Sequence, residues 1–96
     1  MTWLVLVRPD AERDLFTARD WYESKRPRLG DEFLESVALA MRELEQAPDR
    51  RPLYFGKFRR VLLARFPYKI FYQVIGDRAV VFRVLHAKQE HNRGLK

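Results

Sequence analysis

The 96-residue sequence contains no cysteine, which excludes disulfide bonds, thiolate metal ligands and cysteine nucleophiles. It has only two histidines, His86 and His91, and no spacing identifies the carboxylates that a metal site would also need, so we expect neither metal nor cofactor. No apolar run approaches the roughly 20 residues that cross a bilayer, and no signal peptide is recognisable. These absences predict a cytoplasmic protein without membrane contact.

Glycine is also scarce, with four residues, and the sequence has no Gly-rich phosphate loop, HExxH pair or GxSxG elbow. Nothing resembling a linker divides the chain, so residues 1–96 are interpreted as a single domain. Hydrophobic residues make up 47% and aromatic residues 14%, which is enough for a core without covalent staples.

The charge of the chain is strongly asymmetric. Residues 1–48 carry seven Lys and Arg against ten Asp and Glu, a net charge of −3, whereas residues 49–96 carry twelve against three, a net charge of +9. A basic surface of this kind attracts nucleic acid, an acidic protein partner or an anionic membrane, and it can also serve solubility alone.

The first half of the chain predicts one strand followed by two amphipathic helices. The run TWLVLV, residues 2–7, is typical of a strand, and Pro9 marks its end or the start of a helix. Apolar residues recur at helical spacing over 11–22 and again over 33–44, and Pro27 is expected in the first turn of the second helix. The short break between them predicts an antiparallel helical hairpin.

The second half predicts three strands, because its apolar residues alternate with period two over 58–65, 68–75 and 79–86. The sequence GDR, residues 76–78, is interpreted as a three-residue hairpin loop, which would pair Ile75 with Ala79. A two-residue turn would shift the strands by one residue and mix their faces.

The three-residue loop gives the last two strands two distinct faces. The face expected to pack on the helices carries Tyr68, Ile70, Tyr72 and Val74 together with Val80, Phe82, Val84 and His86. The face expected to be open carries Lys69, Phe71 and Gln73 together with Val81, Arg83 and Leu85. The fold class that follows is α+β, in the order β-α-α-β-β-β, with a two-helix hairpin packed on one face of a mostly antiparallel four-stranded sheet.

Basic residues on or beside these strands could contact phosphates, and neighbouring aromatic rings could stack on bases; they are Lys57, Arg59, Arg60, Arg65, Lys69, Arg83 and Lys88. They could equally stabilise the negative charge that develops on a phosphate in the transition state, while His86 or a lysine transfers a proton. A histidine at the end of an apolar strand face is more often structural than catalytic. Composition does not choose among these roles.

Two stretches of the sequence resemble the RelE/ParE superfamily of type II toxin-antitoxin toxins. They are DAERDLFTARDWYESKRPRLGDEFLESV, in the helical hairpin, and FRRVLLARFPYKIFYQVIGDRAVVFRVLHAKQ, in the strands. The resemblance implies a growth-inhibiting toxin, of the kind associated with plasmid stabilization, in a hetero-oligomer with a cognate antitoxin. RelE-like members cut mRNA in the ribosomal A site without a metal, whereas ParE-like members inhibit DNA gyrase and cut no RNA.

Carried onto this sequence, the resemblance places Lys69 where RNA-cutting members commonly have an arginine, and Gln89 where they have a second one. No tyrosine follows Tyr72, so the C-terminal aromatic residue of some of those members is missing. The first hypothesis is therefore a ParE-like gyrase inhibitor, with a RelE-like ribosome-dependent endonuclease and a non-toxic nucleic-acid-binding module as alternatives. Whether the protein is an enzyme stays open.

Site residues follow from both hypotheses. A nuclease would draw its catalytic residues from Lys57, Arg59, Arg65, Lys69, His86 and Lys88. The antitoxin or the cellular target is expected to bind Lys69, Phe71, Arg83, Leu85 and Arg59, and the antitoxin could also add a strand to an exposed sheet edge.

Overall fold

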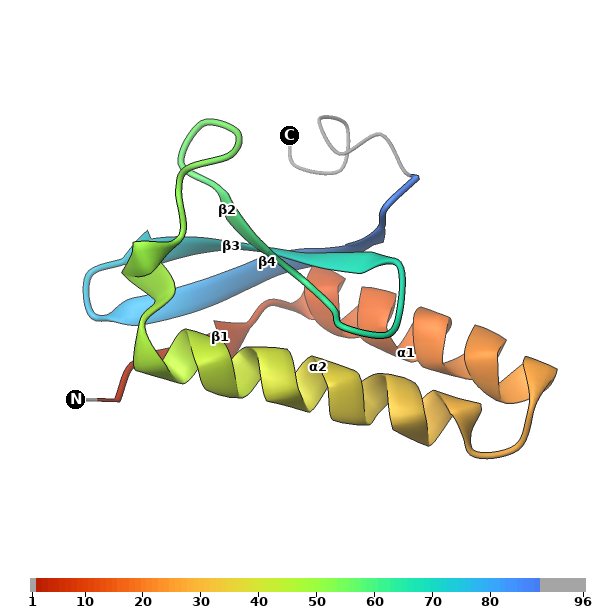
Figure 1. The fold of residues 1–96 in the computed structure, drawn as a ribbon. Helices are drawn as coiled ribbons and strands as arrows, with labels where there is room; N and C mark the ends of the chain where they lie inside the picture. The colour runs from red at the N-terminus through yellow and green to blue at the C-terminus, as the bar shows by residue number, and fades with distance from the viewer. Residues whose placement is uncertain (1, 89–96) are drawn as a thin grey trace.

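A computed structural model describes residues 2–88 as two layers, with two helices covering one face of a four-stranded sheet (Figure 1). In chain order the elements are β1 (Leu4–Val7), α1 (Pro9–Lys25), α2 (Leu29–Gln46), the 3₁₀ helix η1 (Pro48–Arg50), β2 (Arg59–Leu62), β3 (Tyr68–Ile75) and β4 (Arg78–His86). The strand order is β1-β4-β3-β2, with β1 parallel to β4 and the other neighbours antiparallel. The predicted fold class is confirmed. Neither helix in the described part is long and apolar enough to span a membrane.

The helical hairpin turns sharply between α1 and α2. Pro9 opens α1, where its missing N–H would have had no intrahelical partner. Arg28 adopts a left-handed conformation with φ of 73°, so α2 begins at Leu29, and the expectation that Pro27 lies in its first turn is wrong. The carboxylate of Glu23 accepts hydrogen bonds from the backbone N–H groups of Arg28 and Gly30, both at 3.0 Å, and this holds the turn.

The two helices approach closely at Gly30. A Cβ atom at this position would lie 2.8 Å from the backbone carbonyl oxygen of Arg19, which is closer than carbon and oxygen can approach. Glycine is therefore required for this contact between α1 and α2.

The main core fills the space between the helices and the sheet. Its fully buried large side chains include Phe33 and Leu44 from α2 and Ile70, Tyr72 and Val81 from the strands. The hydroxyl of Tyr72 donates a buried hydrogen bond of 2.6 Å to the carbonyl oxygen of Pro48, which ties η1 to the sheet. Burial raises the pKa of Tyr72, so it stays a neutral donor.

The hairpin between β3 and β4 differs from the prediction in its turn. Ile75 pairs with Arg78, so the loop has two residues, Gly76 and Asp77, and the expected pairing of Ile75 with Ala79 is wrong. Gly76 has φ of 62°, as the first position of a tight hairpin turn requires. On the half of β3 nearest the turn, the β4 partners are therefore shifted by one residue, and Ala79 and Val81 face the helices in place of Val80 and Phe82.

A β-bulge restores the predicted register beyond this half. The pairing shifts between Phe71 and Tyr72 of β3, which face Arg83 and Val81, so Phe82 is the extra residue. From Phe71 back to Tyr68 the pairs are those predicted, ending in Tyr68 with His86. Strand β2 is also shorter than its predicted range of 58–65, because the chain turns after Leu62 to bury Leu63 and Phe66 in the core.

Candidate functional site

The face of the sheet opposite the helices, hereafter the open face, carries an apolar cluster of its own. Phe58, Phe71 and Leu85 are buried there, and Phe55 and Phe82 pack against them. The rings of Phe58 and Phe82 meet edge to face with centroids 5.3 Å apart. The open face is therefore a rigid aromatic surface and not a purely solvated one.

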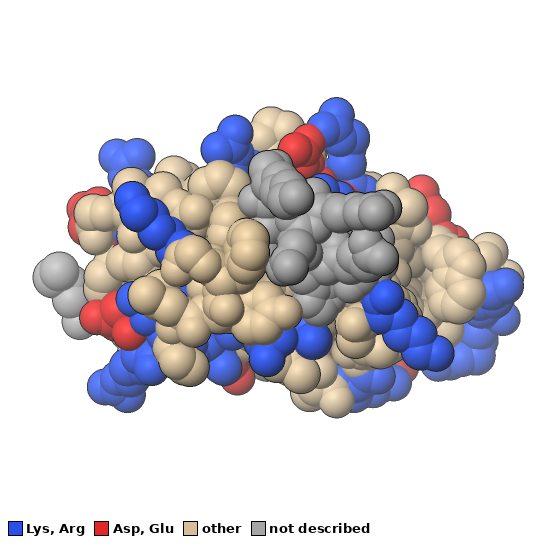
Figure 2. Space-filling view, turned by 90° about the horizontal axis from the view of Figure 1, so that it is seen from above, with Lys and Arg blue, Asp and Glu red and all other residues tan. Residues whose placement is uncertain are grey.

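Cationic side chains surround this cluster and lie on aromatic rings. The guanidinium of Arg60 lies 3.9 Å from the ring centroid of Tyr54, and that of Arg8 lies 4.8 Å from the centroid of Phe82. Lys69 is half-buried on β3, and within the described residues no carboxylate forms an ion pair with it. Seen from this side, blue Lys and Arg side chains lie at the margins of the tan surface that the view leaves visible (Figure 2). The open face thus carries positive charge around an apolar cluster of which Phe55 and Phe82 are the partly exposed members.

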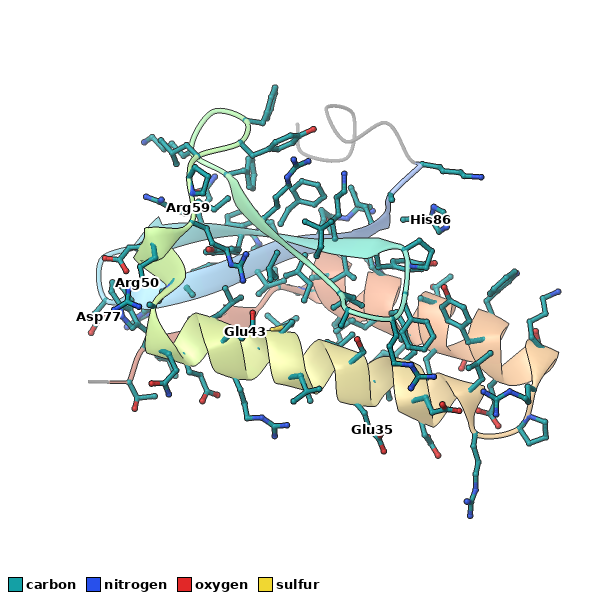
Figure 3. All side chains as sticks on the ribbon, viewed as in Figure 1. Glu35, Glu43, Arg50, Arg59, Asp77 and His86 are labelled. Carbon is teal, nitrogen blue, oxygen red and sulfur yellow. The ribbon has the colours of Figure 1, made fainter. Side chains whose placement is uncertain are left out.

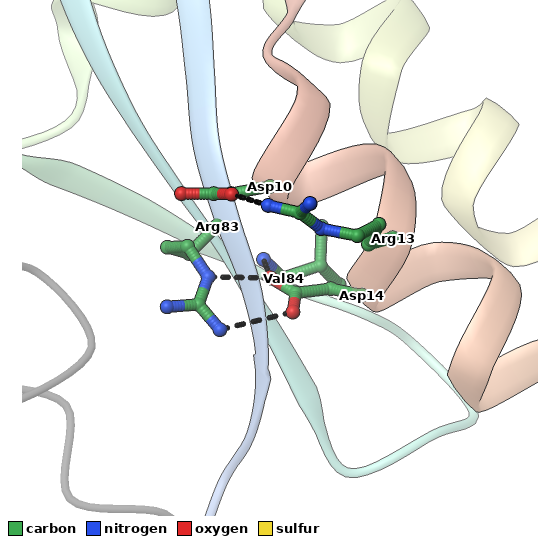
Figure 4. Close-up of polar contacts among 5 residues, drawn as sticks. All are labelled: Asp10, Arg13, Asp14, Arg83 and Val84. Carbon is green, nitrogen blue, oxygen red and sulfur yellow. Dashed lines mark hydrogen bonds and ion pairs between the residues drawn. The ribbon is translucent and has the colours of Figure 1, made fainter.

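The side chain of Arg83 is held by helix α1. Its Nε and Nη2 atoms donate to the carboxylate of Asp14 at 2.7 and 3.0 Å, and the backbone N–H of Val84 donates to the same carboxylate at 2.9 Å (Figure 4). The hydrogen bonds to Asp14 raise the pKa of Arg83. Since the side chains are 29% and 16% exposed, this is a partly buried ion pair that neutralises much of the charge predicted for the open face.

Asp14 is a residue that the sequence reasoning missed. It lies where β1 has ended, so its carboxylate takes the place of a neighbouring strand for the N–H of Val84. In the sequence it looks like one more charge on the polar side of α1, and no local signal connects it to a residue 69 positions away.

Arg59 points to the helix side of the sheet, because it pairs with Tyr72 of the main core. Its Nη1 atom donates to the backbone carbonyl oxygens of Asp49, at 3.2 Å, and of Arg51. These bonds hold the segment after η1 against β2. Arg59 therefore occupies a different place from Lys69, Phe71 and Leu85, with which it was predicted to bind a partner.

His86 lies at the far end of the sheet from Arg59 (Figure 3). Its ring packs edge to face on Tyr68 with centroids 5.2 Å apart, and its Nδ1 atom accepts a hydrogen bond of 3.1 Å from the backbone N–H of Lys88. It borders a pocket of about 380 Å³ on the helix side, which Trp21 and Tyr22 also line.

The other candidate nuclease residues are dispersed as well. Arg65 lies in the loop after β2 and pairs at 2.9 Å with Glu32 of α2, and the hydrogen bonds from Arg65 and Arg26 lower the pKa of Glu32. Lys57 is exposed in the turn before β2, and Lys88 is exposed just beyond β4. Gln89 lies outside the described residues. Within residues 2–88 no group of three or more His, Asp or Glu side chains could hold a metal ion.

Distances estimated from the sheet show how far apart these candidates are. Arg59 pairs with Tyr72 and His86 pairs with Tyr68, four residues along β3. At about 3.3 Å per residue and about 4.8 Å per strand spacing, their backbones lie roughly 13 Å apart along the sheet and 10 Å across it. The structure does not gather the six candidates into one catalytic cluster.

The family comparison matches almost the whole chain. The family described as "ParE toxin of type II toxin-antitoxin system, parDE" matches residues 5–91. The protein belongs to the ParE toxin family. The resemblance drawn from the helical hairpin and the strands is thereby confirmed.

Two solved structures with a similar fold come from toxin-antitoxin systems. A chain of the chromosomal ParDE toxin-antitoxin system from P. aeruginosa superimposes with a TM-score of 0.79 at 19% identity, over 88% of this chain and 96% of that chain. A chain of the toxin-antitoxin complex RelBE2 from Mycobacterium tuberculosis gives a TM-score of 0.61 at 23% identity, over 90% and 99%. At these identities the likeness concerns the fold. No curated protein matches this ParE family member.

Proposed function

We propose that this ParE family protein is a cytoplasmic toxin that inhibits growth by binding DNA gyrase, and that a cognate antitoxin neutralises it. Membership of the ParE family supports the gyrase target over the ribosome. Two structural neighbours belong to a ParDE system and to a RelBE2 complex, which supports an antitoxin partner. Action by protein contact requires a preformed surface and no catalytic group.

The observation that carries this proposal is the dispersal of the nuclease candidates. Arg59 and Arg65 each hold two parts of the fold together, and His86 packs against Tyr68. Stabilising a phosphate transition state requires several cationic and proton-transferring groups within hydrogen-bond reach of one point. This arrangement favours binding of a protein partner over cleavage of RNA.

The open face has the features of a protein-binding surface. It combines the partly exposed rings of Phe55 and Phe82 with peripheral arginines, and aromatic residues and arginine are the types enriched in protein interfaces. Within the predicted binding set, Lys69, Phe71 and Leu85 lie on this face, but Phe71 and Leu85 are buried within the cluster. Arg83 reaches the edge of the face while bound to Asp14. Lys69 is thus the strongest single candidate for a charge contact with the partner.

Purified gyrase tests the target directly. The wild-type protein should inhibit DNA supercoiling, and Lys69→Glu should weaken inhibition about tenfold, as expected when a charge contact becomes repulsive. Arg28→Glu is the matched control, because it makes the same charge change at the tip of the helical hairpin, away from the sheet. If gyrase supercoils DNA fully in the presence of soluble wild-type protein, the gyrase proposal fails. If mRNA 5′ ends phased to the ribosomal A site also appear after expression, the RelE-like activity is supported in its place.

A further inference from the structure

The outer side of α2 carries two opposite charges that the fold does not use. Glu35 and Arg42 are both exposed, and within residues 2–88 neither of them forms an ion pair. By contrast, Glu32 and Glu43 of the same helix each pair with arginines from outside it. Glu35 and Arg42 lie on the same side of α2 but two turns apart, about 10.5 Å along the axis, so they do not reach each other. Both charges are therefore available to a partner, and Glu35 points away from the sheet (Figure 3).

An exposed leucine lies between the two charges, beside a groove. Leu39 is 57% exposed, and together with Glu35 and Arg42 it forms what we call the α2 stripe. Next to Leu39, a groove of about 440 Å³ lies between α2 and the residues after β2, and the small residues Ala40 and Ala64 are among those that line it. Figure 1 shows no element of the described chain on the side of α2 that faces away from the sheet. The stripe thus presents an apolar side chain, and a hollow next to it, to the solvent.

The order acid, leucine, base makes the α2 stripe complementary to itself. If a second α2 lies antiparallel with Leu39 against Leu39, Arg42 of each copy comes within about 1.5 Å of the axial level of Glu35 in the other. Two symmetric ion pairs then flank the leucines, and the twofold axis brings the two grooves side by side. A parallel pair would instead set like charges against each other. Glu43, which would also approach Glu35 of the other copy, is neutralised by Arg51 at 2.9 Å.

We propose that the α2 stripe is a homodimer interface, occupied by the α2 stripe of a second copy of this chain in antiparallel orientation. The inference goes beyond the proposed function and does not depend on it. An 18-residue helix is about 27 Å long and buries less than the roughly 800 Å² per partner of a standard interface, so we expect a Kd of roughly tens of micromolar. The open face lies on the other side of the sheet (Figure 1), so each dimer presents two open faces.

Charge reversal on the stripe tests the interface by sedimentation equilibrium of the purified protein at roughly 5 to 500 μM, a range that brackets the expected Kd. Glu35→Arg and Arg42→Glu should each weaken dimerisation at least about tenfold, because both symmetric ion pairs become repulsive. Glu12→Arg is the matched control, since it makes the same change in net charge as Glu35→Arg at an exposed position of α1. Its Kd should stay within about twofold of wild type. A wild-type protein that stays monomeric at these concentrations would overturn the proposal.

Mixing the two weakened variants separates a specific interface from a general effect of charge. In a heterodimer of Glu35→Arg with Arg42→Glu, each ion pair joins opposite charges again, so the mixture should associate with about the wild-type Kd. The double variant that carries both substitutions should dimerise with itself for the same reason. A mixture no more associated than either variant alone would overturn the interface. If no dimer forms and the two substitutions instead weaken binding of the protein encoded beside the toxin gene, the stripe belongs to that partner. This inference then fails while the proposed function stands.

Discussion

The carboxylate of Asp14 should contribute strongly to the stability of the fold. It accepts two hydrogen bonds from Arg83 and one from the N–H of Val84, and so joins α1 to the edge of β4 beyond the end of β1. Asp14→Ala removes the acceptor of this N–H and of two hydrogen bonds from the guanidinium. Asp14→Asn keeps an acceptor oxygen but loses the charge.

The expected loss of stability on Asp14→Ala depends on how exposed the Asp14–Arg83 ion pair is. Hydrogen bonds to charged groups typically contribute about 1.5 to 3 kcal/mol. Because Arg83 is 29% exposed, water replaces part of what is lost, and we expect Asp14→Ala to reduce the free energy of unfolding by about 2 kcal/mol. For a domain of this size that corresponds to a fall in Tm of about 8 to 16 °C, with roughly half as much for Asp14→Asn.

Urea unfolding of a double-mutant cycle provides the assay. The cycle combines Asp14→Ala with Arg83→Met, which keeps a long apolar stem, and the coupling energy between the two positions should be about 1 kcal/mol. Asp20→Ala, at an exposed position on α1, is the control and should change stability by less than about 0.5 kcal/mol. A coupling energy near zero, or an Asp14→Ala variant as stable as the control, would refute the reasoning.

Three further outcomes are expected. Tyr72→Phe leaves the buried carbonyl of Pro48 without its hydrogen bond and should lower the free energy of unfolding by about 1 to 2 kcal/mol in urea titrations. Because the pKa of Glu32 is lowered in the fold, its stabilising contribution is present above the unfolded pKa, about 4.3, and is lost as the pH falls through the folded value. Glu32→Gln should therefore make stability less dependent on pH below about 5, and an unchanged acid limb in unfolding curves would contradict this. Gly30→Ala should lower the free energy of unfolding by about 1 to 3 kcal/mol, since its Cβ would collide with the backbone of Arg19. Gly76→Asn, measured in the same urea titrations, should lower it less, because asparagine tolerates the left-handed conformation and nothing lies near the added Cβ.

Local patterns in the sequence predict most of this fold. The alternation over 68–75 gives β3 with its observed bounds, and helical spacing gives both helices to within a few residues. The register of β4 could be predicted only in part, because a two-residue turn and a bulge at Phe82 compensate each other. The turn and the bulge each shift the pairing of β4 by one residue, in opposite directions. The predicted pairing is therefore correct in the half of the hairpin next to Tyr68 and wrong in the half next to the turn.

The candidate site was less predictable, since it depends on contacts between distant residues. Lys69, Phe71 and Leu85 could be assigned to the open face from strand alternation alone. The capture of Arg83 by Asp14 depends on where β1 ends relative to α1, and the role of Arg59 depends on the path of the chain after η1. Neither depends on the type of the residue itself, so no local pattern encodes them.

Strand β4 is the last strand in residues 2–88, yet it lies inside the sheet between β3 and β1. Its pairing of Arg78 with Leu4 joins residues about 74 positions apart, and closing such a loop costs about 4 kcal/mol of chain entropy before any contact is gained. The sheet therefore closes only after a ribosome has released almost the entire described chain. An interrupted translation product that stops before β4 lacks the strand with which both β1 and β3 pair, so it cannot form this sheet.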